Sequence, residues 1–237
     1  MLDLQAADSE LDQLEHRLKK LPEHAALVEL SSRRERVTRD HGLTETEVSD
    51  LTREQRKADA DVEQVKGRLA RDQQRLDTGV VTDPKQIQAI QHEIETLHRR
   101  ISALEDEELE VMERLEEAQG RLDSLAGELV EIEKAMGEQT VARDTAASGI
   151  AEHRAKSKAE RDSLAADLPA ELLALYDRLR RQLDGVGVGA LHQKRCGGCR
   201  LEVGAADLAR IAAAPSDEVL RCEECNRILV RTAESGI

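Results

Sequence analysis

The chain has 237 residues, of which 35% are charged and none is Trp or Phe, and its formal net charge at pH 7 is −14. This composition excludes an ordinary globular core and favours long helices or coiled coils. No apolar stretch approaches the roughly 18 residues of a membrane-spanning helix, and the first residues lack a secretory signal pattern. We therefore expect a cytoplasmic protein with no membrane partner.

The sequence up to about residue 140 predicts a long antiparallel helical hairpin. Two series of apolar residues at heptad spacing run through residues 30–76 and 87–136. Between them, Asp83 has the character of a helix N-cap and Pro84 follows at the first helical position. The tip of the hairpin is therefore predicted near residues 77–84. Residues that face one another across it should have numbers adding up to about 161.

Two shorter helices are predicted outside these seams. An amphipathic helix precedes Pro22, and another follows Leu168, with Tyr176 on or beside its apolar face. We assign residues 1–183 to the helical hairpin with a short third helix at 168–183, and residues 184–237 to a separate module. The predicted fold class is mainly α, with a long antiparallel coiled-coil hairpin and a small C-terminal zinc-ribbon (β) module.

All four cysteines lie in this module, and their spacing predicts the metal site. They form two CxxC pairs, Cys196–Cys199 and Cys222–Cys225. Four thiolates on two such turns complete a tetrahedral site for one structural zinc, so we expect nearby His192 to be a surface residue. An iron or iron–sulfur centre uses the same ligands and stays open. A redox-active CxxC would need a βαβ context that the sequence lacks.

The rest of the module is interpreted around these cysteines. We expect Gly197, Gly198 and Asn226 to take the unusual backbone angles of the two knuckles. Residues 219–221 and 227–231 are read as two short strands that flank the second knuckle.

Six basic residues of the module have two interpretations. They are candidates for contacting nucleic acid: Lys194, Arg195, Arg200, Arg221, Arg227 and Arg231. All but the last are also candidates for compensating the net charge of about −2 on a four-thiolate zinc centre. Residues 190–237 hold seven Lys/Arg, seven Asp/Glu and no aromatic residue, which favours charge compensation.

Val80 and Val81 are apolar residues at the predicted tip, where solvent is expected. One interpretation is that they staple the turn, and the other is that they form a docking tip for a partner. No Gly-rich phosphate loop or nucleophile–base set accompanies them, so we expect neither enzymatic activity nor a small-molecule substrate.

The sequence resembles a bacterial family of four-cysteine zinc-ribbon proteins with a long N-terminal coiled-coil hairpin, described as zinc-ribbon or nucleic-acid-binding proteins. Three parts carry the resemblance: residues 78–116 (TGVVTDPKQIQ and the helix after it), residues 168–182 (LPAELLALYDRLRRQ), and the cysteine segments RCGGCRLEV and LRCEECNRILVR. The excess of arginine over lysine is similar to that of an actinobacterial, mycobacterial member.

This resemblance implies zinc bound by the four cysteines, no enzymatic activity and a role in binding partners. For relatives in flagellated or type III secreting bacteria, the resemblance implies adaptors that engage an alternative sigma factor, export components or messenger RNA. Family members commonly carry Pro and Gly in the second knuckle, whereas this chain has Glu223, Glu224 and Asn226, and the two acids weaken any transfer of nucleic-acid binding. We favour a non-enzymatic scaffold or adaptor that engages protein partners; the alternative is a regulatory protein that binds RNA or DNA through the ribbon.

Overall fold

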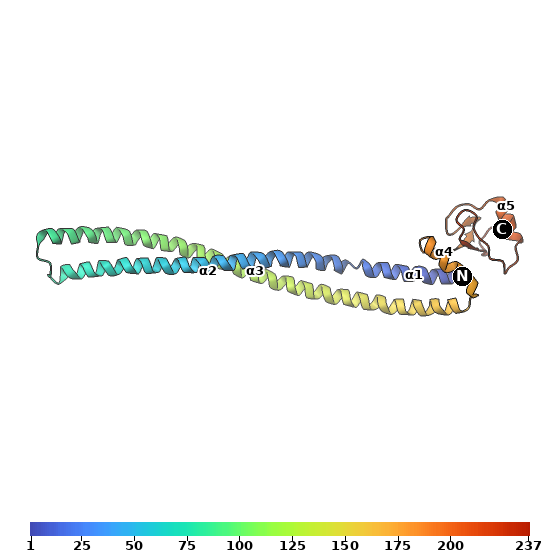
Figure 1. Ribbon diagram of the computed structural model, residues 1–237, viewed down its shortest axis with the longest axis horizontal. Helices are drawn as coiled ribbons and strands as arrows, with labels where there is room; N and C mark the ends of the chain where they lie inside the picture. The colour runs from blue at the N-terminus through green and yellow to red at the C-terminus, as the bar shows by residue number, and fades with distance from the viewer. The chain divides into compact units, whose positions relative to one another are not determined.

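The computed structural model describes residues 1–237 and is mainly helical, as predicted (Figure 1). Its helices are α1 (Leu2–Lys19), α2 (Pro22–Asp77), α3 (Pro84–Ala166), α4 (Ala170–Gln182) and α5 (Ala205–Ala213), and its strands are β1 (Val188–His192), β2 (Arg195–Cys196) and β3 (Ile228–Val230). The short helix α5 was not predicted from the sequence. None of the helices combines the length and apolar character that a bilayer crossing requires.

Residues 26–139 form one compact unit, the hairpin unit, in which α2 and α3 run antiparallel. Its buried contacts come from the predicted heptad positions: one cluster contains Leu51, Leu115 and Ala118, and another contains Leu69, Leu97 and Ile101. These side chains meet only because both helices present an apolar stripe at the same level.

Ion pairs across this unit define the register of the two helices. Arg33 pairs with Glu128 at 2.6 Å, and Arg68 pairs with Glu93, so both pairs add up to the predicted 161. The other three pairs across the hairpin have higher sums, namely 168 for Arg114–Glu54 and for Arg121–Glu47 and 171 for Lys66–Glu105. The higher sums arise in part because side chains on a helix lean toward its N-terminus, which shifts antiparallel contacts to higher numbers.

The turn at the tip has the predicted capping geometry. The Asp83 carboxylate accepts a hydrogen bond from the Lys85 amide at 3.2 Å, and the Asp83 carbonyl accepts one from Ile87 at 3.0 Å. Gly79 has a φ of 64°, in the left-handed region that glycine adopts without strain. Val80 is 77% exposed and Val81 is partly buried, so the turn covers only one of the two valines.

A second compact unit, the ribbon-bearing unit, contains Met1–Ala25 and Thr140–Ile237. Its helices and its sheet share one core, in which Leu4 of α1, Tyr176 of α4 and Val188 of β1 are buried together. The predicted division of the chain at residues 183 and 184 stays a prediction. In this unit, the residues on either side of it pack as neighbours.

The sheet of the ribbon has the order β2-β1-β3. Strand β1 pairs antiparallel with β2 and parallel with β3, where Gly189 faces Leu229. The predicted strand at 227–231 is present as β3, but the one predicted at 219–221 was wrong and forms only an isolated bridge from Arg221 to Ile228. This segment follows the turn at Pro215 and enters the second knuckle at Cys222, so it is too short for a longer ladder.

Candidate metal centre and the polar network beside it

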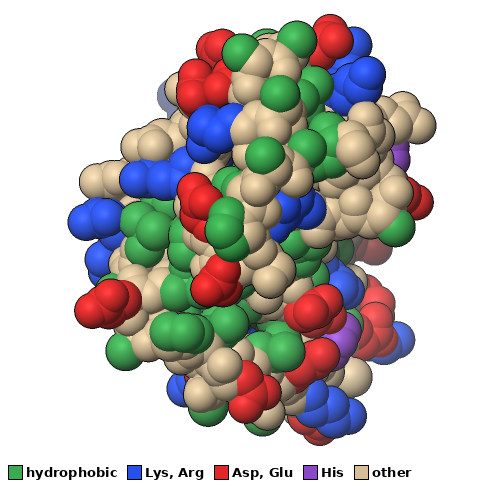
Figure 2. Space-filling model, turned by 90° about the vertical axis from the view of Figure 1, so that its right-hand side faces the viewer, with side chains coloured by type: hydrophobic (Ala, Val, Ile, Leu, Met, Phe, Trp, Pro, Cys, Tyr) green, Lys and Arg blue, Asp and Glu red, His purple; other side chains and the backbone are tan.

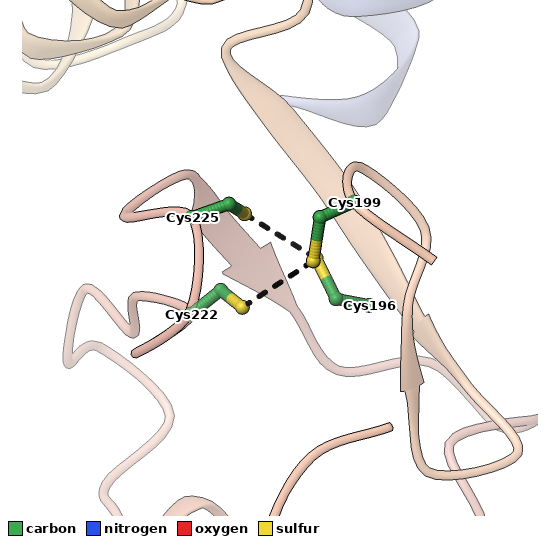
Figure 3. Close-up of side chains that lie close together, drawn as sticks. All are labelled: Cys196, Cys199, Cys222 and Cys225. Atoms are coloured by element: carbon green, nitrogen blue, oxygen red, sulfur yellow. Dashed lines mark hydrogen bonds between the residues drawn. The ribbon is translucent and has the colours of Figure 1, made fainter. Parts of the chain in front are cut away.

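The four cysteines converge on one point in the ribbon (Figure 3). Their sulfur atoms all lie within 4.8 Å of one another, and the Cys196–Cys225 and Cys199–Cys222 sulfur distances are both 3.9 Å. Zinc–sulfur bonds of about 2.3 Å at tetrahedral angles place the sulfurs about 3.8 Å apart. The observed spacing therefore fits a tetrahedral zinc held by four thiolates.

The two knuckles have the same backbone geometry. In the first, the Arg200 amide donates to the Cys196 carbonyl at 2.7 Å; in the second, the Asn226 amide donates to the Cys222 carbonyl at 2.8 Å. The donor residues have φ angles of 63° and 62°, so Asn226 takes the predicted left-handed conformation and Arg200 is its equivalent. Gly197 and Gly198 have no positive φ, so the left-handed positions of the knuckles are taken by Arg200 and Asn226 and not by these glycines.

Close packing, rather than backbone freedom, requires glycine at position 198. A Cβ atom built there would lie 2.4 Å from Cδ of Arg227. The Arg227 side chain passes over this glycine and donates to the carbonyls of Val186 at 2.7 Å and Leu183 at 3.0 Å. Arg227, which follows the second knuckle, thereby packs over the first knuckle and binds the segment that connects α4 with β1.

The thiols have different proton affinities when no metal compensates them. Burial raises the pKa of Cys196 and raises that of Cys222 to about 12. Burial also acts to raise the pKa of Cys225, but hydrogen bonds from the backbone and side chain of Arg227, together with those from the Cys199 and Cys222 thiols, outweigh it and lower that pKa to about 7. Since zinc binds thiolates, loading the site with metal releases protons.

Three of the six candidate nucleic-acid residues are engaged in hydrogen bonds within the ribbon. Arg227 binds the carbonyls described above, Arg231 donates to the carbonyls of Ile211, Ala214 and Pro215 at the end of α5, and Arg221 donates to the Asn226 carbonyl. The remaining three are exposed and form no ion pair: Lys194, Arg195 and Arg200. On the face shown in Figure 2, acidic and basic side chains alternate with apolar ones.

His192 lies on the surface, as expected, with a side chain that is 54% exposed and an Nε2 atom 3.3 Å from the Glu234 carboxylate. The group of side chains arranged for metal binding contains the four cysteines and no histidine. A four-sulfur site is therefore complete without it.

A buried polar network beside the ribbon was not predicted from the sequence. Asp8 of α1 is 3% exposed and accepts a hydrogen bond from the Tyr176 hydroxyl at 2.7 Å. Arg161 of α3 pairs with the same carboxylate at 3.2 Å and with Asp177 at 3.2 Å. Burial, followed by the bond to Asp8, raises the pKa of Tyr176 well above its usual value. The tyrosine therefore stays a neutral donor to the carboxylate.

Gln5 links this network to the sheet. Its side-chain oxygen accepts a hydrogen bond from the Gly187 amide at 2.7 Å, and its nitrogen donates to the Gly185 carbonyl at 2.8 Å. The start of β1 is thus fixed to α1 by a buried side chain, since Gln5 is 8% exposed. In the sequence, the only sign of this contact is that Gln5 is a polar residue one turn before Asp8 in α1.

Comparison with known proteins identifies a coiled-coil hairpin domain and a zinc ribbon domain in this chain. Residues 4–184 match the family described as the CT398-like coiled coil hairpin domain, and residues 195–229 match the C4-type zinc ribbon domain. An uncharacterized protein of Mycobacterium tuberculosis is 36% identical over 98% of this chain and 94% of its own length. One from Mycobacterium leprae is 33% identical over 93% of this chain and 94% of its own length.

Solved structures agree with the fold. A protein from Mycobacterium smegmatis has a TM-score of 0.79 at 35% identity and covers 97% of this chain and 94% of its own. CT398 from Chlamydia trachomatis has a TM-score of 0.68 at 18% identity, over 98% and 95% of the two chains, and shows likeness of fold alone. On the hairpin match, the four-cysteine ribbon and the mycobacterial relatives, the chain belongs to the CT398-like coiled-coil hairpin family with a C4-type zinc ribbon.

Proposed function

We propose that the protein is a cytoplasmic, non-enzymatic adaptor that engages protein partners through its coiled-coil hairpin and its zinc ribbon. The observation that carries the proposal is the tip of the hairpin, where Val80 is 77% exposed, more than any other large apolar side chain. An apolar side chain exposed to water on the turn adds nothing to the hairpin core, and we infer from its place at the tip that it contacts a partner.

Charged residues of both signs surround the tip. Arg71 and Lys85 flank the turn and form no ion pair, whereas Arg75 pairs with Asp72 at 3.3 Å. Asp77 and Asp83 border the same turn and form no ion pair either, so the charges balance and we expect a partner to meet the tip through an apolar surface.

In this proposal, the cysteines bind one structural zinc per chain. All four ligands are sulfur, and Cys196 and Cys222 are 1% and 3% exposed within the core of the ribbon. A site closed by four thiolates leaves no position for a substrate, and a small module gains folding free energy from the ion. Four free thiols in this arrangement also suit a reducing compartment.

The tip is tested by comparing two charge insertions on exposed valines. Full-length zinc-loaded protein would be crosslinked in mycobacterial cells, and captured proteins would be quantified for the unchanged chain, Val80→Asp and Val28→Asp. Val28 is the matched control, because it is 68% exposed on α2 but distant in sequence from the tip. We expect Val80→Asp to remove a specific partner and Val28→Asp to retain it. Equal capture by all three proteins would refute a docking tip.

Binding of RNA or DNA by the ribbon is the second candidate, favoured by the three exposed, unpaired residues Lys194, Arg195 and Arg200. Affinity for a fluorescent single-stranded 20-nucleotide RNA would be measured at increasing salt. If the ribbon binds nucleic acid, the affinity should fall with salt, and the triple alanine variant should lower the salt slope by about two to three. Absence of binding at low salt would remove this candidate.

A further inference from the structure

A groove lies in the ribbon-bearing unit where α1 ends and α2 begins, with α3 along its other side. Its volume is about 550 Å³, and its apolar floor is formed by Leu14, Leu21 and Ile150. Leu14 and Ile150 are 2% and 7% exposed, so the floor is the outer surface of the packed core. The helical chain is interrupted between Lys19 and Pro22, and the residues at this break line the groove.

The other side of the groove is kept open by a glycine. Gly149 lies within α3 and lines the groove, and a Cβ atom built on it would meet nothing within 4 Å. Glycine in a helix interior costs roughly 0.5 to 1 kcal/mol relative to alanine. Space for a larger side chain therefore exists at this position, and the chain leaves it empty.

The charged residues at the rim are all basic or histidine. His16, Arg17, Lys20 and His153 line the groove, and no Asp or Glu does. His153 lies 3.2 Å from Glu10, but Arg17 and Lys20 form no ion pair. The neighbouring groove between α1, α3 and α4 is lined by four acidic and four basic side chains, so the imbalance is specific to this one. It occurs in a chain whose net charge is −14.

We propose that this groove is a docking site for an acidic segment of a partner protein, which inserts a large apolar side chain between Gly149 and Leu21. The floor supplies the apolar contact, and Arg17 and Lys20 pair with Asp or Glu on either side of the inserted residue. Nucleic acid fits less well, because the only rings in the groove that could stack on bases are those of His16 and His153, and its apolar floor offers phosphates no donor. The inference rests on the proposed adaptor function, for which it names a site and a class of partner.

The probe is a random 16-residue peptide library displayed against the full-length zinc-loaded protein. Enriched peptides would be synthesised, and their affinities would be measured by fluorescence anisotropy for the unchanged chain and for two variants of the groove. Gly149→Leu fills the groove from a position with open space, and Arg17→Glu combined with Lys20→Glu reverses its charge. The matched controls are Gly127→Leu, where a Cβ likewise meets nothing within 4 Å, and Lys134→Glu, both on exposed positions of α3.

We expect the enriched peptides to carry Asp or Glu next to Leu, Ile, Phe or Trp. Each groove variant should lower their affinity by about tenfold or more, because the apolar contact or two ion pairs are lost, and the controls should change it less than about twofold. Failure of the selection to enrich acidic apolar peptides, equal binding to Gly149→Leu, or self-association through the groove in sedimentation experiments would overturn the proposal. Loss of a cellular partner with Val80→Asp but not with Gly149→Leu would reject the groove while leaving the adaptor function in place.

Discussion

The hydrogen bond between Tyr176 and Asp8 gives the sharpest test of how the ribbon-bearing unit is held together. Both side chains are buried, and the hydroxyl lies 2.7 Å from the carboxylate. Tyr176→Phe removes only this oxygen and keeps the ring in the core. A hydrogen bond to a charged group contributes about 1.5 to 3 kcal/mol, and we expect about 1.5 because Arg161 still pairs with Asp8 at 3.2 Å.

Removing the carboxylate should be more damaging than removing the hydroxyl. Asp8→Ala leaves the Tyr176 hydroxyl and the Arg161 guanidinium without their buried partner. Breaking a buried pair costs about 3 to 5 kcal/mol, and the lower value applies because the Arg161 side chain is 22% exposed. Asp12→Ala is the matched control one turn along α1, since Asp12 pairs with Arg180 at 2.6 Å but its side chain is 53% exposed. An exposed pair contributes at most about 1 kcal/mol.

Hydrogen exchange with mass spectrometry measures these losses of stability region by region, because backbone amides exchange faster when the surrounding structure opens more often. Amides of α1 and β1 should exchange about tenfold faster in Tyr176→Phe, more than a hundredfold faster in Asp8→Ala, and less than about fivefold faster in Asp12→Ala. Amides of the hairpin unit serve as the internal reference. Exchange in Tyr176→Phe within twofold of the unchanged chain would refute the view that this hydrogen bond holds the unit closed.

Three further predictions concern the tyrosine and the metal site. Tyr176 is the only tyrosine, and its pKa in the folded protein lies above the unfolded value of about 10. The free energy of unfolding should therefore be unaffected by this group below pH 10 and should fall above it. Phenolate absorbance should appear only when the protein unfolds. Cys222→Ser should reduce bound zinc from about one ion per chain to none in elemental analysis and unfold residues 190–237 while helical circular dichroism persists; loss of helix throughout would contradict it. Gly198→Ala should cost about 1 to 3 kcal/mol, because its Cβ displaces Arg227, and should speed zinc release to a colorimetric chelator; an unchanged release rate would count against this packing.

Local patterns in the sequence were sufficient for the hairpin and for the metal centre. Heptad positions such as Leu51 and Leu115 are buried as predicted, because a period of 3.5 residues places them on one face of a helix whatever the partner is. Asp83 and Pro84 marked the start of α3 because capping depends on neighbouring residues alone. The two CxxC pairs bring four sulfurs together because each knuckle is a local turn.

The sequence-based predictions failed where a residue forms hydrogen bonds with groups that are distant in the chain. At the end of α5, the Ile211 carbonyl accepts a hydrogen bond from Arg231, which lies 20 residues further along the chain. At the start of this helix, the Gly204 N-cap provides no side-chain hydrogen bond. Short-range signals for α5 in the sequence are therefore weak. Arg227 was a candidate for nucleic acid, but its donors bind carbonyls 41 and 44 residues earlier. The sequence does not show whether the fold will bring a backbone carbonyl within hydrogen-bond distance of a basic side chain.

By itself, then, the sequence determined the elements whose causes are local: long amphipathic helices, a capped turn and two metal-binding knuckles. Only the tertiary structure decided that Asp8 and Tyr176, 168 residues apart, share a buried hydrogen bond, and that Gln5 holds the first strand of the ribbon against α1. The physical reason is that a polar residue in a helix does not show by itself whether it will face solvent or the core. That depends on which segments pack against the helix in the folded protein. Once such an Asp or Gln is buried, it must form hydrogen bonds inside the protein, because a buried polar group without a partner is costly.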